Sequence, residues 1–281
     1  LFFFNHKTAS EIPLRLVGSE MCIRDRYNTA ATRLIQDNDR RITGLEISGP
    51  DGYETISARA IVLACGGFES NPEMRARYLG PGWDLARVRG TRHNMGDGIK
   101  MAIDIGARAY GNWSGCHSVG WDISSPEYGD YEVLDNFQKH SYPWGIMVNT
   151  DGKRFVDEGE DLRNHTYVRF GREIMNQPNR TAIQIFDQKT IPLLRDEYRI
   201  RQVTKVASES IEGLARELEI SETALKETVN EFNAACVPGN FNPSILDGVT
   251  TEGLSPNKLS LIHISEPTRR RGISYAVFCL K

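Results

Sequence analysis

The feature of this sequence that most constrains the fold is a short apolar run that ends at a pair of glycines. Residues 60–64 (AIVLA) contain no polar side chain, which is typical of a strand buried on both faces. Cys65, Gly66 and Gly67 follow at once and end the run. Two glycines at the carboxyl end of a strand let backbone N–H groups approach a phosphate chain, because no Cβ atom stands in the way. A purely structural tight turn explains the same glycines equally well, so the turn alone does not decide for a ligand.

Hydrophobic periodicity predicts further elements on both sides of this turn. Alternation favours strands over residues 29–35, 41–47, 54–63, 146–149, 154–156 and 181–187. A helical period favours helices that open near 95, that run over about 167–177 and 211–218, and that begin at a Ser221 cap. The apolar positions of the last two helices are Ile211, Leu214, Ala215, Leu218, Leu225, Val229 and Phe232. We expect these stripes to face a core.

Both ends of the sequence resemble translated adapter DNA. Residues 259–269 (LSLIHISEPTR) match a translation of the transposase adapter of a common sequencing library. Residues 16–25 (LVGSEMCIRD) match the opposite strand of that adapter in another frame. One adapter accounts for both ends, so we expect residues 1–26 and 259–281 to be artefacts with few contacts to the body. The alternative is a natural amphipathic N-terminus and a natural basic C-terminal tail.

Without these end segments the chain is acidic. The full sequence has 34 Lys and Arg against 37 Asp and Glu, of which the ends hold eight and four, so residues 27–258 keep 26 against 33 and a formal charge of −7. An acidic surface argues against nonspecific nucleic-acid binding, which depends on basic patches. An anionic substrate would therefore need a local basic pocket.

Cysteine usage and hydropathy narrow the class of protein further. Outside the end segments the cysteines are Cys65, Cys116 and Cys236, and their spacing fits neither a disulfide framework nor a zinc site. We expect no metal and a reducing, cytoplasmic compartment. No apolar run approaches the ~20 residues that span a bilayer.

Three motifs in a fixed order carry a family resemblance. Residues 58–74 (ARAIVLACGGFESNPEM) precede residues 94–107 (NMGDGIKMAIDIGA), then comes His117, and then residues 145–161 (GIMVNTDGKRFVDEGED). This series closely resembles the flavoprotein subunits of fumarate reductase and succinate dehydrogenase. Within that superfamily, VRGTRHN (88–94), RFVDEGED (154–161) and VPGNFNPSILDG (237–248) are similar to the tricarballylate dehydrogenase group. The resemblance covers essentially all of residues 27–258.

The resemblance implies an α/β fold with an α+β cap. Residues 27–115 would form part of a Rossmann-like FAD-binding domain, and residues 116–258 most of the capping domain that closes over substrate. Family members begin with a βαβ unit that carries G-x-G-x-x-G and end with a segment that returns to the flavin. No G-x-G-x-x-G occurs in this sequence. We therefore expect an internal piece of a longer protein, which by itself binds FAD poorly.

The resemblance also implies FAD as the cofactor and names the residues that would face it. These are Ala31, Ala64, Gly66, Gly67, Asn71, Gly96, Asp97 and Gly98. Met95 stands where the family's T-G-D-G has Thr, and Cys65 where A-T-G-G has Thr or Ser. Read without the resemblance, Gly96 to Gly98 is ambiguous, because a helix N-terminus attracts anions but also simply needs a cap.

The resemblance implies a substrate site as well. His117 lies where the family places a histidine that binds a substrate carboxylate. Arg163 is the nearest match to the proton-donating arginine, with Arg169 and Arg172 as alternatives because GED is inserted relative to simpler members. Tyr167 is the nearby phenol. A guanidinium fork suits this role because it binds a carboxylate through two hydrogen bonds. The neighbouring acidic residues, which either hold that arginine or face water, are Glu158, Glu160 and Asp161.

The implied reaction is hydride transfer between flavin N5 and a carbon of a small polycarboxylate, which is oxidised to an alkene beside a carboxylate. A fumarate- or urocanate-type reductase is one alternative. A 3-ketosteroid dehydrogenase is another, and it should show an apolar, Tyr-lined pocket in place of His117 and Arg163. An inactive truncated polypeptide is the alternative of a different class. The sequence does not indicate the electron acceptor.

Overall fold

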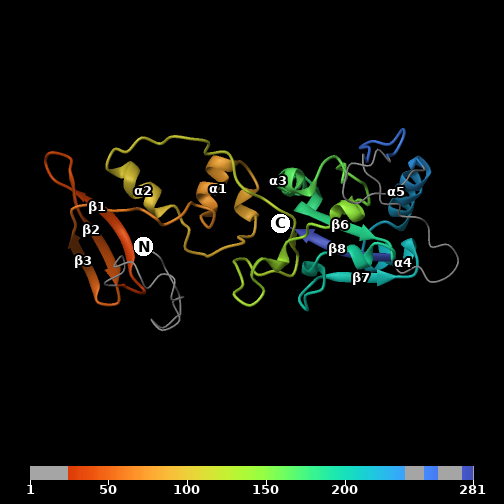
Figure 1. The fold of residues 1–281 in the computed structure, drawn as a ribbon, viewed down its shortest axis with the longest axis horizontal. Helices are drawn as coiled ribbons and strands as arrows, with labels where there is room; N and C mark the ends of the chain where they lie inside the picture. Colours follow the sequence, from red (N-terminus) through yellow and green to blue (C-terminus); the bar gives the residue numbers. More distant parts are fainter. Residues whose placement is uncertain (1–24, 238–249, 259–273, 281) are drawn as a thin grey trace. The chain divides into compact units, whose positions relative to one another are not determined.

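The computed structural model describes residues 25–237, 250–258 and 274–280. They divide into two compact units, whose elements are labelled in Figure 1. The first unit consists of the residues up to Gly80 together with Arg92–Ser114, and the second of Pro81–Thr91 together with the residues from Gly115 onward. The domain boundary that we expect between residues 115 and 116 stays a prediction.

In its described residues, the first unit combines an antiparallel sheet with two α-helices. Its strands form a meander in the order β1 (Ala30–Gln36), β2 (Ile42–Gly49) and β3 (Gly52–Ser57). Asp37 shapes the turn between β1 and β2, because its Oδ1 accepts hydrogen bonds from the N–H groups of Asp39 and Arg41 at 2.9 and 2.8 Å. The helices are α1 (Pro72–Leu79) and α2 (Asp97–Asp104). The side chain of Gln36 at the end of β1 reaches the carbonyl of Ile105, just after α2, at 3.4 Å.

The strand predicted over residues 54–63 is wrong in its second half. β3 ends at Ser57, and residues 60–67 lie outside any strand. Val62 is 83% exposed and Leu63 41% exposed. An apolar run forms a strand only where neighbouring strands bond its backbone groups, and no strand among the described residues lies beside this one.

The second unit is built on an antiparallel sheet whose strands differ in length. Its strands are β4 (Trp121–Asp122), β5 (Ile146–Val148), β6 (Thr181–Phe186), β7 (Lys205–Ser208) and β8 (Ser274–Leu280). The order is β4-β8-β6-β5, and β7 also pairs with β8. The α-helices are α3 (Arg163–Met175), α4 (Ile211–Glu217) and α5 (Glu222–Ala235). The 3-10 helices are η3 (Trp83–Leu85), η4 (Leu134–Phe137), η5 (Tyr142–Trp144), η6 (Pro178–Arg180), η7 (Ile191–Leu193) and η8 (Asp196–Tyr198).

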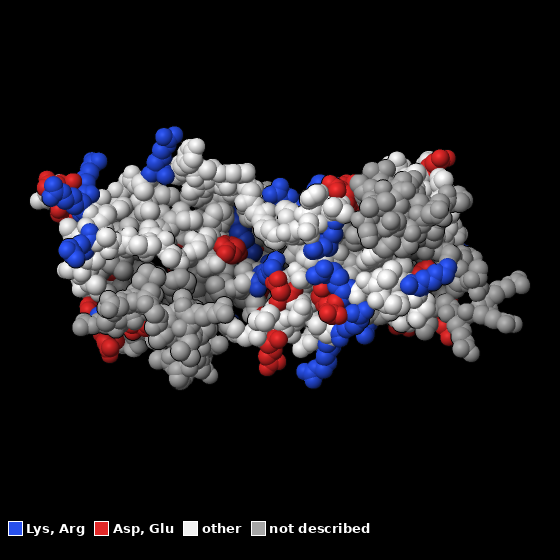
Figure 2. All heavy atoms as spheres, viewed as in Figure 1, with Lys and Arg blue, Asp and Glu red and all other residues white. Residues whose placement is uncertain are grey.

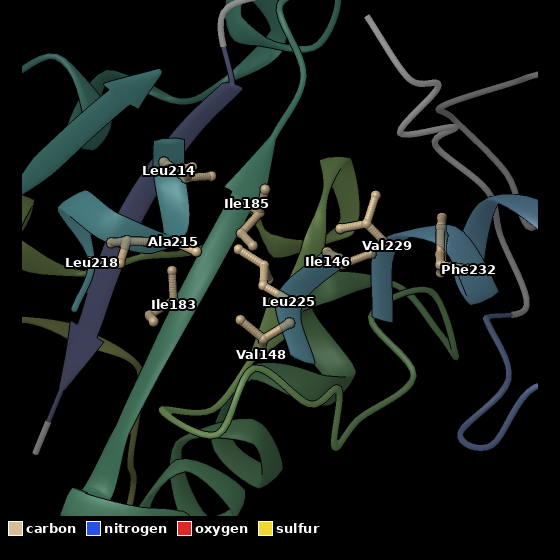
Figure 3. Packing of buried hydrophobic residues seen from close by; sticks show 10 residues of the cluster. All are labelled: Ile146, Val148, Ile183, Ile185, Leu214, Ala215, Leu218, Leu225, Val229 and Phe232. Atoms are coloured by element: carbon tan, nitrogen blue, oxygen red, sulfur yellow. The ribbon is translucent and has the colours of Figure 1, made fainter. Parts of the chain in front are cut away.

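Strand β6 lies at the centre of the core and is buried at every position. Successive side chains of a strand point to opposite faces, so Ile183 and Ile185 pack with the apolar residues of α4 and α5 (Figure 3). Ala182 instead belongs to a second cluster with Phe170 and Ile174 of α3. The predicted apolar stripes of α4 and α5 are confirmed, because Leu214, Ala215, Leu218, Leu225, Val229 and Phe232 are all buried.

The C-terminal segment differs from our expectation. Residues 259–281 were expected to make few contacts, and this is wrong for 274–280, which form β8 between β4, β6 and β7. The segment SYAVFCL is rich in β-forming residues, and β6 offers it a row of backbone groups on the side away from β5. Residues 1–24, 259–273 and 281 lie outside the described residues, and so do 238–249.

Two boundaries also differ from the sequence pattern. α3 begins at Arg163, about one turn before the predicted start near residue 167. The strand predicted over residues 154–156 shrinks to a single bridge between Val148 and Arg154. The Arg154 side chain turns instead to the buried carboxylate of Glu158, with Nε 3.1 Å from Oε1.

Candidate functional site

The glycine turn of the first unit packs against the start of α2. Gly66 has a φ of +73°, and a Cβ atom there would lie 2.8 Å from Asn94 Oδ1. The N–H of Gly96 donates to the carbonyl of Gly67 at 3.0 Å, and the N–H of Ser70 donates to the carbonyl of Asn94 at 2.9 Å. The motifs at residues 58–74 and 94–107 therefore form one substructure, in which the glycines are needed for close approach.

Asn71 links the same two motifs through both ends of its amide. Its Oδ1 caps α1 by accepting from the N–H of Met74 at 3.1 Å, and its Nδ2 donates to the carbonyl of Met95 at 2.9 Å. A sequence reading assigns Asn71 to the cofactor, whereas the structure gives its side chain a structural task. One N–H of the amide and one lone pair of its oxygen remain for a ligand, so the structural role is compatible with the expected cofactor contact.

The helix start at Gly96, Asp97 and Gly98 is shaped for close packing. Gly96 has a φ of +83° and no side chain caps α2. Asp97 is exposed and Gly98 is buried. A methyl group on Gly98 would overlap Cys65 Sγ. Each glycine of this motif therefore has a local steric reason, independent of any ligand.

Backbone donors remain open at the turn, which is the property a phosphate or ribityl chain requires. Within residues 25–237 and 250–258 nothing accepts a hydrogen bond from the N–H of Gly66 or of Gly67. The residues around this turn thus fit the FAD expectation. Of the other predicted cofactor residues, Ala64 is exposed just before the turn, and Ala31 lies in β1, where it pairs with Ile47.

The second unit brings His117 and Tyr167 together. His117 Nε2 lies 2.6 Å from the Tyr167 hydroxyl, and the two rings meet edge to face with centroids 5.1 Å apart. The residues are 50 positions apart in the chain. Arg163 lies one turn before Tyr167 on α3, with its guanidinium 5.9 Å from the centre of the Tyr167 ring. These three predicted site residues therefore form one cluster.

A glycine in α3 permits this arrangement. A Cβ atom on Gly171 would lie 2.5 Å from the backbone nitrogen of Val119 and 2.7 Å from the carbonyl carbon of Ser118. Ser118 Oγ donates to the carbonyl of Val168 at 2.7 Å. The segment that carries His117 thus lies directly on the helix that carries Tyr167.

His140 is a member of the cluster that the sequence reading missed. Its Nδ1 lies 3.1 Å from Arg163 Nη1, and its ring meets the Tyr167 ring edge to face at 5.0 Å. The residue is only 5% exposed. Burial, and after it the positive charge of Arg163, lowers its pKa to about 3. The one signal in the sequence is the run Lys139, His140 and Ser141, three polar residues in an aromatic stretch, all of which are buried.

The two alternative arginines have other partners. Arg169 forms ion pairs with Glu160 and, at 3.9 Å, with Glu173. Arg172 is exposed and donates to the carbonyl of Cys116 at 3.4 Å. Among the described residues, neither bonds to the imidazole or phenol groups of the cluster, although both lie on α3.

The acidic residues near Arg163 do not hold it. Glu158 is fully buried and binds Arg154, and its Oε1 accepts from the N–H of Met147 at 2.6 Å. Glu160 binds Arg169, and Asp161 lies 3.1 Å from His165 Nδ1. Across the described part of the chain, Arg163 forms no ion pair. Its charge is available to an anion.

Figure 2 shows acidic and basic side chains interspersed on the face that it draws. In the residues that the structure describes there is no cluster of His, Cys, Asp and Glu that could hold a metal ion. No helix among them has the length and apolar character to cross a membrane.

Comparison with known proteins identifies the family. The model of the FAD binding domain family matches residues 13–243. The chain belongs to this FAD-binding family. FAD is accordingly its cofactor, as the family resemblance implied.

Individual relatives lie at moderate identity. The chain is 28% identical over 231 residues to the probable fumarate reductase Ifc3 of Shewanella frigidimarina, covering 80% of this chain and 37% of that protein. It is 30% identical over 196 residues to the 3-oxosteroid 1-dehydrogenase of Mycolicibacterium smegmatis, covering 66% and 32%. The chain thus spans about a third of the length of these curated relatives.

A solved structure shares the fold. The open conformation of a flavocytochrome c3 fumarate reductase superposes with a TM-score of 0.67 and 23% identity, over 95% of this chain and 43% of that one. The predicted fold class, a fumarate reductase-type flavoprotein fold of mixed helix and sheet, is confirmed.

Proposed function

We propose that this sequence is an internal part of a longer FAD-dependent oxidoreductase that acts on the CH–CH group of a small polycarboxylate such as tricarballylate. The observation that carries the proposal is the cluster of Arg163, His117 and Tyr167, in which a guanidinium has no acidic partner among the described residues. A relative named as a fumarate reductase supports a carboxylate substrate. The adapter origin of residues 1–26 and 259–281 belongs to the same proposal.

The side chains of the cluster have distinct roles in this proposal. Arg163 binds one carboxylate through its fork and holds the proton that the second half of the reaction moves. His117 binds another carboxylate, and the Tyr167 hydroxyl, 2.6 Å from its Nε2, fixes the ring and its proton. The flavin, when bound, supplies the exchange of hydride with substrate. Catalysis by a proton-moving side chain contributes a factor on the order of 10² to 10⁴.

A second candidate is a 3-ketosteroid dehydrogenase. It is favoured by the relatives named 3-oxosteroid 1-dehydrogenase, one of them 30% identical. Against it stands the polar character of the cluster, because a steroid ring offers no carboxylate to Arg163 and His117. An inactive truncated polypeptide is the remaining candidate.

The test uses the full-length protein that contains this sequence, purified with FAD. Bound flavin is mixed anaerobically with tricarballylate or with a 3-ketosteroid, and the chemically reduced flavin is mixed with fumarate. Bleaching by tricarballylate, or recolouring by fumarate, supports the proposal. Bleaching by the steroid alone assigns the second candidate. A protein that retains FAD and reacts with none of the three contradicts both.

A further inference from the structure

The hydrogen-bond partner of the Arg163 guanidinium is a histidine, not a carboxylate. Its Nη1 lies 3.1 Å from His140 Nδ1. A protonated guanidinium can only donate, so in the resting protein Nδ1 is the acceptor and the ring proton of His140 resides on Nε2. In the described ranges this is the one hydrogen bond that the guanidinium of Arg163 forms with a side chain.

Burial and the neighbouring positive charges keep the imidazole of His140 neutral. Arg163 and Tyr167 face it from α3, and burial together with the charges of Arg163, Arg195, Arg89 and His117 disfavours its protonated form. The nearest carboxylate is that of Glu197 on η8, whose Oε1 is 3.9 Å from Nδ1. That carboxylate is already bound by Arg195 Nε, 2.8 Å from the same oxygen.

The backbone on both sides of His140 is fixed. Lys139 Nζ lies 3.2 Å from Asp122 Oδ2 with both side chains fully buried, and it also donates to the carbonyl of Glu197 at 3.3 Å. The N–H of Ser141 donates to the Tyr198 hydroxyl at 2.8 Å. A side chain mounted on so rigid a segment loses little further freedom when it orients a neighbour.

A neutral acceptor differs from the carboxylates that hold other arginines of this unit. Arg154 is bound by Glu158, and Arg169 by Glu160. An ion pair neutralises the guanidinium locally and weakens its attraction for a further anion. The imidazole of His140 orients the guanidinium of Arg163 without cancelling its charge.

We propose that His140 is the positioning residue of Arg163, a neutral tether that presents the guanidinium to an anionic substrate. The inference rests on the proposed function for its substrate class. His140 itself need not touch the substrate. Its Nε2 is buried and has no hydrogen-bond partner among the described residues, so the Arg163 contact is the polar interaction that fixes the ring.

Three substitutions of His140 distinguish a residue that positions Arg163 from one that only stabilises the fold. His140→Asn keeps an acceptor near the position of Nδ1, His140→Leu removes it, and His140→Asp replaces it with a charged one. In the full-length FAD-loaded protein we expect His140→Asn to retain kcat/KM within about threefold, and His140→Leu to lose about tenfold or more, the equivalent of one hydrogen bond. His140→Asp should raise KM more than it lowers kcat, because the new charge neutralises Arg163.

A second measurement does not depend on turnover. Nitrogen NMR of the histidine rings in the 281-residue chain should show His140 as the Nε2–H tautomer throughout pH 5–8, and Arg163→Leu should abolish that preference. If the wild-type full-length protein turns over no carboxylate while the tautomer result holds, the proposed function fails and the tether stands. A charged His140 at pH 7, or equal KM values for wild type, His140→Leu and His140→Asp, overturns the tether.

Discussion

At the scale of single residues, the partner of each arginine decides what that arginine can do. Arg154 and Arg169 face carboxylates, whereas Arg163 faces a neutral imidazole. An exposed ion pair contributes only about 0–1 kcal/mol to stability. It also neutralises the arginine locally and so weakens its attraction for another anion. Because Arg163 forms no ion pair among the described residues, its positive charge remains unneutralised beside His117 and Tyr167. That is the local basic site which an acidic chain needs to bind an anion.

Stability should depend on pH through His140. Its pKa is about 3 in the folded chain against 6.5 for the free side chain. Between these two pKa values only the unfolded chain binds the proton. The contribution of His140 to the free energy of unfolding is therefore complete above the pKa of the free side chain, and it is lost as the pH falls toward the pKa in the folded chain. From pH 7 to pH 5 the unfolding free energy should drop by roughly 2 kcal/mol on this account. Urea unfolding at the two pH values should show a smaller drop in His140→Asn. Equal drops would refute the assignment.

Removing His117 should act on binding. The side chain is exposed and its one described polar contact is the Tyr167 hydroxyl. In the full-length enzyme His117→Ala should raise KM by about tenfold while kcat changes little, because a lost ground-state contact is uniform binding. Tyr167→Phe keeps the ring but frees His117, and should raise KM less. A large loss of kcat with unchanged KM in His117→Ala would argue for a different role.

Single residues of the cluster also show which contacts the sequence could not predict. His117 and Arg163 were found because motifs surround them. His140 was not, because its partner lies 23 positions away and nothing in the aromatic stretch specifies the pairing. Sequence order likewise could not choose among Arg163, Arg169 and Arg172, since all three lie on α3 and only packing decides which one faces the imidazole.

At the scale of elements, α3 organises the cluster. It carries Arg163 and Tyr167, and its glycine at position 171 lets the segment with His117 lie against it. The stripes of α4 and α5 could be predicted because an amphipathic pattern encodes its own burial. The structure of the apolar run at residues 60–64 could not be predicted. A strand forms only where another strand bonds its backbone groups, and the sequence of the run does not specify which segment lies beside it.

Gly171→Ala should therefore be harmful despite a better helix former. Alanine favours the helix by about 1 kcal/mol, but its methyl group would press on the backbone nitrogen of Val119 at 2.5 Å. Overpacking costs about 1–3 kcal/mol, so a net loss is expected, together with a rise in KM as His117 moves. Gly90→Ala, outside any helix, is the control for an added methyl group without a clash, since a methyl there meets nothing within 4 Å. Equal unfolding free energies for the two variants would contradict the close packing.

The packing of the glycine motifs can be tested by a double-mutant cycle. Gly98→Ala should destabilise the first unit by about 1–3 kcal/mol because its methyl group overlaps Cys65 Sγ. In a Cys65→Ala background the nearest remaining Cys65 atom is Cβ at 3.7 Å, an ordinary contact. The loss should then largely disappear, and urea unfolding of the four proteins measures the coupling. Additive effects would show that the two motifs do not meet there.

At the scale of the whole molecule, a family assignment and a local cluster support each other. The FAD binding domain family matches residues 13–243, and the fold superposes on a fumarate reductase. Neither comparison chooses a substrate, because the relatives include both fumarate reductases and steroid dehydrogenases. The choice of a carboxylate rests on the unneutralised charge of Arg163.

The measurement that tests this claim most directly is the rapid-reaction rate of flavin reduction by tricarballylate, or of flavin oxidation by fumarate, in the full-length protein. Arg163→Ala should slow it by a factor on the order of 10² to 10⁴, as expected for a lost proton-moving group. Arg163→Lys should recover only part, because an ammonium lacks the planar fork. Arg172→Ala, an exposed neighbour on α3, is the control and should keep the wild-type rate. Near-normal rates in Arg163→Ala would contradict the account.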